Sequence, residues 1–98
     1  MEITVNKNAT ELTLSPVGRI DTATAPELKE AVDTNISGVT ELTFDLAKLN
    51  YLSSAGLRVL LSAQKIMNKQ GNMKLINVND EIIDILDMTG LTDVFTIE

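Results

Sequence analysis

The chain contains no cysteine and no histidine, and both absences restrict the chemistry open to it. Without cysteine there is no disulfide framework, no thiol nucleophile and no thiolate ligand for a metal. Histidine is the commonest general acid and base near neutral pH. Fourteen carboxylates are present, but none falls into a recognisable hydrolase motif. We therefore predict a binding protein and not an enzyme, with no metal site and no cofactor of its own.

Aromatic residues are also scarce, at 3% of the chain, whereas hydrophobic residues make up 44%, so the core has to be aliphatic. Ninety-eight residues suffice for one domain with a modest core. The sequence has no apolar run of the roughly 18 residues that a spanning helix needs. Its N-terminus lacks the basic and apolar regions of a secretory signal. These features predict a single cytoplasmic domain over residues 1–98, without membrane insertion.

Positive charge is in the minority, and the net charge is −6. Nucleic-acid binding is driven by attraction to phosphates, so we predict no nucleic-acid partner. A negative surface suits a protein that meets a basic partner, and it equally suits plain solubility. Charge alone does not separate these two interpretations.

Hydrophobic periodicity divides the chain into strands and helices. Strand-like alternation is centred on residues 3–5, 12–20, 39–46, 73–78 and 94–97, and helical spacing on residues 24–36, 54–70 and 80–89. Pro16 interrupts the second strand, where we expect a bulge or an exposed edge. Thr24 and Glu27 have the spacing of a capping box. The order β-β-α-β-α-β-α-β predicts an α/β fold, in which a mixed sheet of about five strands carries helices mainly on one face.

The most informative stretch is residues 50–57, which joins a strand to the long helix and carries two hydroxyls, Ser53 and Ser54. Serine ahead of a helix is a preferred N-cap, because its oxygen accepts an unpaired backbone N–H. The same helix end carries partial positive charge and favours a phosphate. From the residues alone, each serine can be a cap, a phosphate acceptor or both.

The helix of residues 54–70 carries a polar stripe and an unusually wide apolar arc. The excess apolar surface is either buried under neighbouring helices or leaves Leu57 or Leu61 exposed for a partner. The stripe is formed by Arg58, Ser62, Lys65 and Lys69. Arg58 lies one turn after Ser54, close enough to pair with a phosphate or with a partner carboxylate.

Residues 51–57, with Asp45 and Leu46 upstream, closely resemble the signature of STAS domains, and more narrowly that of bacterial anti-sigma factor antagonists. The resemblance extends over the whole chain. It includes residues 18–21, Thr24, Leu28 and residues 88–91. It implies the STAS fold and a protein that switches between partners.

The resemblance also implies how the switch operates. In this family the serine two residues before the motif glycine is phosphorylated by the anti-sigma factor, a GHKL-type kinase, and that position is Ser54. The unphosphorylated protein binds the anti-sigma factor, so that a sigma factor is released. The phosphorylated protein dissociates from the anti-sigma factor, and a separate serine phosphatase removes the phosphate. Members often carry an acidic residue where this chain has Ser53, which becomes a second acceptor candidate, and Ser or Thr where it has Ala55.

Partners of this family dock on the start of the long helix and the adjoining loops. The residues expected to contact a partner are Asp21, Thr24, Asp45, Ser53, Ser54, Ala55, Gly56, Leu57, Arg58 and Leu61. Asp21 and Asp45 match acidic positions that flank the site in the family, and bonds to backbone in turns are an equal explanation for both.

Three other functions compete with this prediction. Stand-alone STAS domains also serve as small subunits of ABC-type lipid transporters, where they bind the ATPase. An orphan regulator of another signalling pathway would use the same chemistry, and hydrolase activity is disfavoured by the missing catalytic residues. We expect a monomer or a weak dimer.

Overall fold

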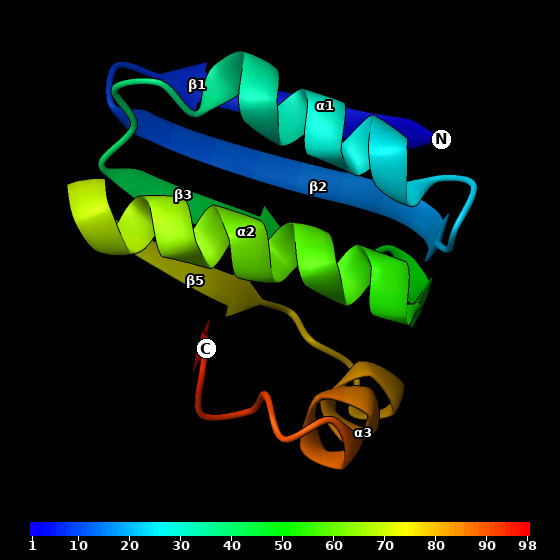
Figure 1. Ribbon diagram of the computed structural model, residues 1–98. Coiled ribbons are helices and arrows are strands. Elements are labelled where there is room, and N and C mark those ends of the chain that lie inside the picture. Colours follow the sequence, from blue (N-terminus) through cyan, green and yellow to red (C-terminus); the bar gives the residue numbers. More distant parts are fainter.

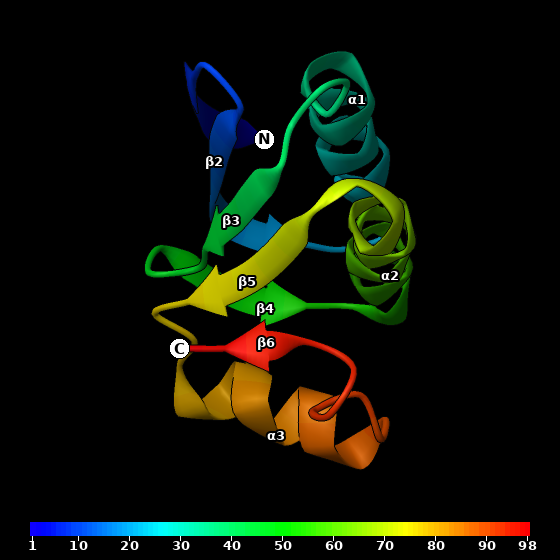
Figure 2. The same cartoon turned by 90° about the vertical axis from the view of Figure 1, so that its left-hand side faces the viewer.

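The computed structural model describes residues 1–98 as six strands and three helices (Figure 1). In chain order they are β1 (Glu2–Asn8), β2 (Glu11–Ile20), α1 (Ala25–Asn35), β3 (Glu41–Asp45), β4 (Leu49–Leu52), α2 (Ser54–Gln70), β5 (Asn72–Ile76), α3 (Asp80–Met88) and β6 (Thr96–Ile97). Helices α1 and α2 lie side by side on one face of the sheet, α3 lies beyond β4 and β6, and the other face is open (Figure 2). The predicted fold class is confirmed.

The sheet follows the order β1-β2-β3-β5-β6, and β4 pairs separately with β2. β1 and β2 form an antiparallel hairpin, and every other pairing is parallel, as the crossover helices require. β4 is not predicted as a strand of its own by the hydrophobic pattern. The sheet therefore has six strands, not about five.

Strand β2 is long enough to have two successive parallel neighbours. Its first part pairs with β3 and its last three residues pair with β4. Pro16 lies between these two pairings, opposite Ile3 of β1, so its missing N–H costs no bond to a parallel neighbour. The expectation of a bulge or an exposed edge at Pro16 is wrong, because Pro16 is buried and in register with β1. The pairing with β4 is irregular two residues later, between Gly18 and Arg19, where the Gly18 N–H donates to the Lys48 carbonyl at 2.9 Å.

The core lies between the helix-covered face of the sheet and the helices. It comprises 23 buried residues, all hydrophobic, and Phe44 and Phe95 are its two aromatic members. No polar or charged residue is buried. Helix α1 contributes Leu28 and Val32 to this core, on the stripe that helical spacing predicts. No helix combines the length and the hydrophobicity needed to cross a bilayer.

Candidate functional site

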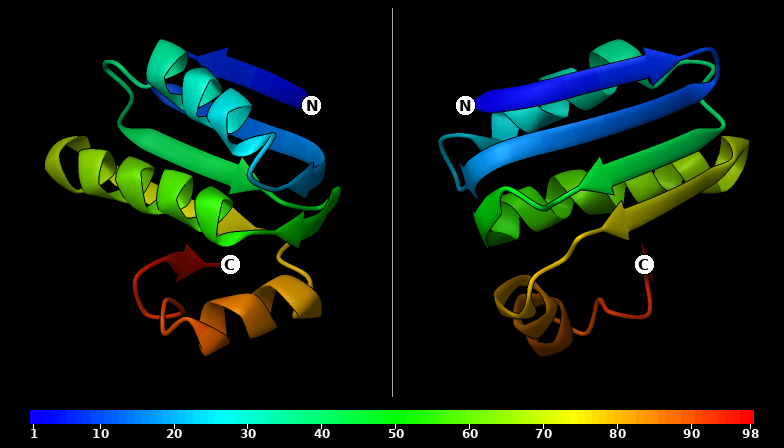
Figure 3. Two further views of the ribbon diagram at one scale, coloured as in Figure 1. Left: turned by 45° about the vertical axis from the view of Figure 1, so that its right-hand side comes forward. Right: turned by 180° about the vertical axis from the view of Figure 1, so that it is seen from behind.

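β4 leads directly into α2 (Figure 3, left), and the two serines at this junction have different roles. Ser53 is the N-cap of α2: its Oγ accepts the Gly56 N–H at 3.2 Å, and its own N–H donates to the Ile20 carbonyl at 2.8 Å. Ser54 is the first residue of the helix, and its side chain is exposed, with no hydrogen bond to the rest of the chain. The cap is therefore Ser53, and the free hydroxyl is Ser54.

Gly56 brings this helix end against the sheet. A Cβ at this position would lie 2.5 Å from Ile20 Cγ2 and 2.6 Å from Leu52 Cδ1, so only glycine allows the first turn of α2 to approach β2 and β4 this closely. Leu57, 4% exposed, packs into the same core, and Leu61 is half-buried against it. Gly56 and the Leu57 side chain are thus buried and not available to a partner. Of the two alternatives for the wide apolar arc, Leu57 follows burial under neighbouring elements and not exposure.

Asp21 and Thr24 shape the loop between β2 and α1. Asp21 Oδ1 accepts the N–H groups of Ala23 and Thr24, both at 3.0 Å, and Thr24 Oγ1 donates to the Arg19 carbonyl at 2.8 Å. The predicted capping box is wrong, because Asp21 satisfies the Thr24 N–H from outside the helix and Glu27 instead pairs with the amino group of Met1. The hydrogen bond from the Thr24 backbone is the main cause that lowers the pKa of Asp21 below its ordinary value.

This lowered pKa predicts an acid-dependent contribution of Asp21 to stability. The unfolded chain binds a proton more readily, so the contribution is complete above the unfolded pKa of about 3.9 and disappears as pH falls through the lower folded value. In Asp21→Asn the amide oxygen can still accept both N–H groups, but the charge is gone. We expect the free energy of unfolding, from urea titrations between pH 2 and 6, to fall less steeply below about pH 4 in the variant. Parallel curves for the two proteins would contradict this assignment.

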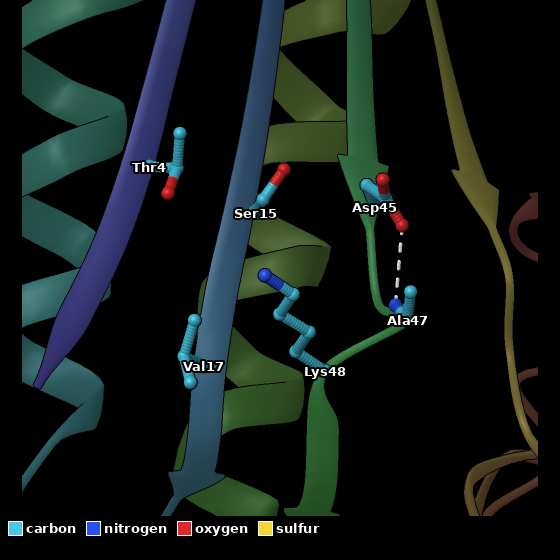
Figure 4. Close-up of a pocket in the computed structure, with 6 residues that line it drawn as sticks. All are labelled: Thr4, Ser15, Val17, Asp45, Ala47 and Lys48. Atoms are coloured by element: carbon cyan, nitrogen blue, oxygen red, sulfur yellow. Dashed lines mark hydrogen bonds between the residues drawn. The ribbon is translucent and has the colours of Figure 1, made fainter.

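Asp45 lies on the other side of the sheet from the helices. Its Oδ1 accepts the Ala47 N–H at 3.1 Å and an Nδ2–H of Asn77 at 2.9 Å, so it orders the turn after β3. Figure 4 shows it at a shallow pocket on the open face, with Lys48 and Ser15 nearby and α2 behind the strands. The structure does not bring Asp45 to Ser54, and turn hydrogen bonding accounts for it.

A groove runs between the first turns of α1 and α2, which begin at the same end of the sheet (Figure 1). Its volume is ≈ 290 Å³. It is lined by Thr22, Ala25, Pro26, Lys29, Ala55, Arg58, Val59 and Ser62. Lys29 and Arg58 are its charged residues; Lys29 is paired with Asp33, whereas Arg58 forms no ion pair. Sequence reasoning found Ala55 and Arg58 but missed the α1 side, because only the packing of the two helices brings it there.

A cation–π contact near the ends of β2 and β4 is not predicted by the sequence pattern. The guanidinium of Arg19 lies over the Tyr51 ring, 4.5 Å from its centroid, which joins the ends of β2 and β4. Such a contact at an exposed site is worth about 0.5–1 kcal/mol. It stabilises β4, the strand that ends at Leu52, one residue before Ser53. No group of three or more Asp or Glu side chains is placed to hold a metal ion.

Comparison with known proteins gives a family and a fold. The family model of the STAS domain matches residues 1–98. The chain is 31% identical over 98 residues to the anti-sigma-B factor antagonist of Bacillus subtilis, covering 99% of this chain and 90% of that protein.

Solved structures share the architecture. An anti-sigma factor antagonist from Mycobacterium paratuberculosis superposes with a TM-score of 0.88 at 24% identity, covering 98% of this chain and 83% of that one. The anti-sigma factor antagonist SpoIIAA superposes with a TM-score of 0.84 in its unphosphorylated form and 0.77 in its phosphorylated form, each at 15% identity. Those alignments cover 99% of this chain and 88% and 91% of the two SpoIIAA chains. At these identities the likeness is one of fold.

Proposed function

The chain belongs to the STAS domain family, and we propose that it is an anti-sigma factor antagonist switched off by phosphorylation of Ser54. In the unphosphorylated form it binds an anti-sigma factor, a serine kinase of the GHKL type, and so frees a sigma factor. Phosphorylation by that kinase ends the binding, and a serine phosphatase restores the active form. The switch operates in the cytoplasm, and the ATP belongs to the kinase.

This proposal rests on one observation: of the two adjacent serines, one caps the helix and the other has a free hydroxyl. Ser53 caps α2, which leaves the exposed Ser54 hydroxyl free to react without loss of a bond that holds the helix. In the transfer, Ser54 Oγ forms a bond to the γ-phosphorus of Mg-ATP held by the kinase. The bond between that phosphorus and ADP breaks, and a base of the kinase takes the hydroxyl proton. The product phosphate lies at a helix N-terminus, where the dipole favours its charge.

The surface around Ser54 supports a protein partner. Ala55 and Arg58 follow it on α2, the groove between α1 and α2 lies alongside, and Leu61 adds a half-buried apolar contact. A phosphate here adds a charge of about −1.5 to −2 to the contact surface of a chain whose net charge is already −6. A partner fitted to the neutral hydroxyl would be repelled, while the domain itself stays folded.

The test is the intact mass of the chain after incubation with Mg-ATP and the GHKL-type kinase encoded nearest to its gene. We expect one added phosphate on the wild type and on Ser53→Ala, and none on Ser54→Ala. Ser53→Ala should in addition lose about 1 kcal/mol of stability, because it removes the cap. Loss of the phosphate only in Ser53→Ala would reassign the acceptor. No phosphate on any variant, together with stable binding to an ABC-type ATPase, would replace the proposal with the transporter role.

A further inference from the structure

Arg58 is an exposed cation on the surface of α2 that has no partner within the chain. No hydrogen bond or ion pair engages its guanidinium. Residues of an α-helix advance by about 100° each, so Arg58 lies about 40° around the axis from Ser54 and about 60° from Ala55, which lines the groove. Arg58 therefore lies between Ser54 and Ala55 around the helix axis, one turn further along α2, and it lines the groove itself.

We propose that Arg58 is the intramolecular receptor of the phosphate on Ser54 and holds it across one turn of α2. This inference rests on the proposed function, because it concerns the phosphorylated form. An anion four residues ahead of a cation is the favourable orientation of an i, i+4 pair. A guanidinium also matches phosphate geometry with two parallel hydrogen bonds. The bonds are non-covalent, so the pairing needs no further reactant.

The pairing gives the phosphate a second effect on the partner surface. Of the two charged groove residues, Lys29 already pairs with Asp33, so Arg58 supplies the positive charge that remains available there. Once Arg58 turns to the phosphate, that charge is neutralised. Phosphorylation thus adds negative charge at Ser54 and withdraws positive charge from the groove in one step. A partner carboxylate seated beside Arg58 would lose its counter-charge.

The test uses phosphoserine incorporated at position 54 by genetic encoding, so that no kinase is needed. The measurement is the ³¹P NMR titration of the phosphate, whose second pKa is about 6 when nothing perturbs it. A neighbouring cation favours the doubly charged form, so the titration midpoint should be about 0.5 pH unit lower with Arg58 than in Arg58→Gln. Arg58→Lys should keep part of the difference, because it retains the charge but loses the fork.

The matched control is Lys65→Gln, which removes another exposed cation of α2 two turns further on and should leave the midpoint as in the wild type. Raising the salt concentration should shrink the Arg58 effect by screening. Equal midpoints in the wild type and Arg58→Gln, or an equal change in Lys65→Gln, would overturn the inference. Neither outcome would touch the proposed function, because the phosphate is installed without the kinase.

Discussion

Gly71→Ala should lower the midpoint of thermal unfolding by about 15 °C or more, the largest stability effect expected of a single methyl group in this chain. A Cβ at this position would lie 2.0 Å from the carbonyl oxygen of Thr40 and 2.7 Å from its carbon. Both are backbone atoms, so no side chain can rotate out of the way. The same oxygen accepts the Asn72 N–H at 2.9 Å, so moving Thr40 would break the bond that starts the β3–β5 pairing.

The size of this effect follows from the clash and not from backbone strain. The φ angle of Gly71 is 174°, which any residue can adopt. Overpacking usually costs about 1–3 kcal/mol, and a contact with fixed backbone lies at or above that upper end. A domain of this size has only about 5–15 kcal/mol of total stability to lose.

Gly38→Ala is the matched control for this prediction. Gly38 lies in the loop that leads into β3, and a Cβ there would meet nothing within 4 Å. Its φ of +77° is the left-handed region, so alanine should cost about 1–2 kcal/mol through strain alone. Thermal unfolding followed by circular dichroism measures both variants. A Gly71→Ala midpoint no lower than that of Gly38→Ala would show that Thr40 and β3 move aside easily.

The sequence predicts best those elements whose buried residues recur with a single regular spacing, either that of a strand or that of a helix. β3 and β5 alternate between buried and half-buried or exposed positions, and α2 presents its polar stripe at helical spacing. β4 cannot be predicted in this way, because only the first and last of its four residues are buried and the strand shows no alternation. The N-terminal cap of α1 is predicted wrongly for a different reason. Asp21 competes with Glu27 for the Thr24 N–H, and local spacing cannot tell which of the two carboxylates is nearer.

The candidate site likewise has one part that the sequence predicts and another part that only the tertiary structure shows. The motif around Gly56 selects a pair of serines, but only the hydrogen bond between Ser53 and the Gly56 N–H shows which of them is free. The groove beyond them is a tertiary feature. Lys29 and Arg58 are far apart in sequence and lie at one groove because α1 and α2 begin at the same end of the sheet. No spacing rule within either helix contains that information.

Phosphoserine at position 54 should weaken binding to the anti-sigma factor by 100-fold or more, which corresponds to about 2.7 kcal/mol. Like charges or an unpaired charge brought into a contact surface cost several kcal/mol, because the phosphate loses water without gaining a partner from the other protein. The measurement is isothermal titration calorimetry with the kinase that phosphorylates the chain in the mass assay, in the absence of ATP. Ser54→Ala should bind as the wild type does, since it adds no charge.

The decisive control places the same phosphate elsewhere. Ser37 is exposed after the C-terminal end of α1, whereas Ser54 begins α2 at the end of the sheet where α1 starts. Phosphoserine at position 37 adds the same charge to the chain as a whole, so it reproduces any effect of net charge. If repulsion is local, it should leave the dissociation constant within about threefold, because charges more than about 10 Å apart are largely screened at 0.1 M salt. Equal weakening at both positions would mean that net charge, and not the surface around Ser54, governs the partner.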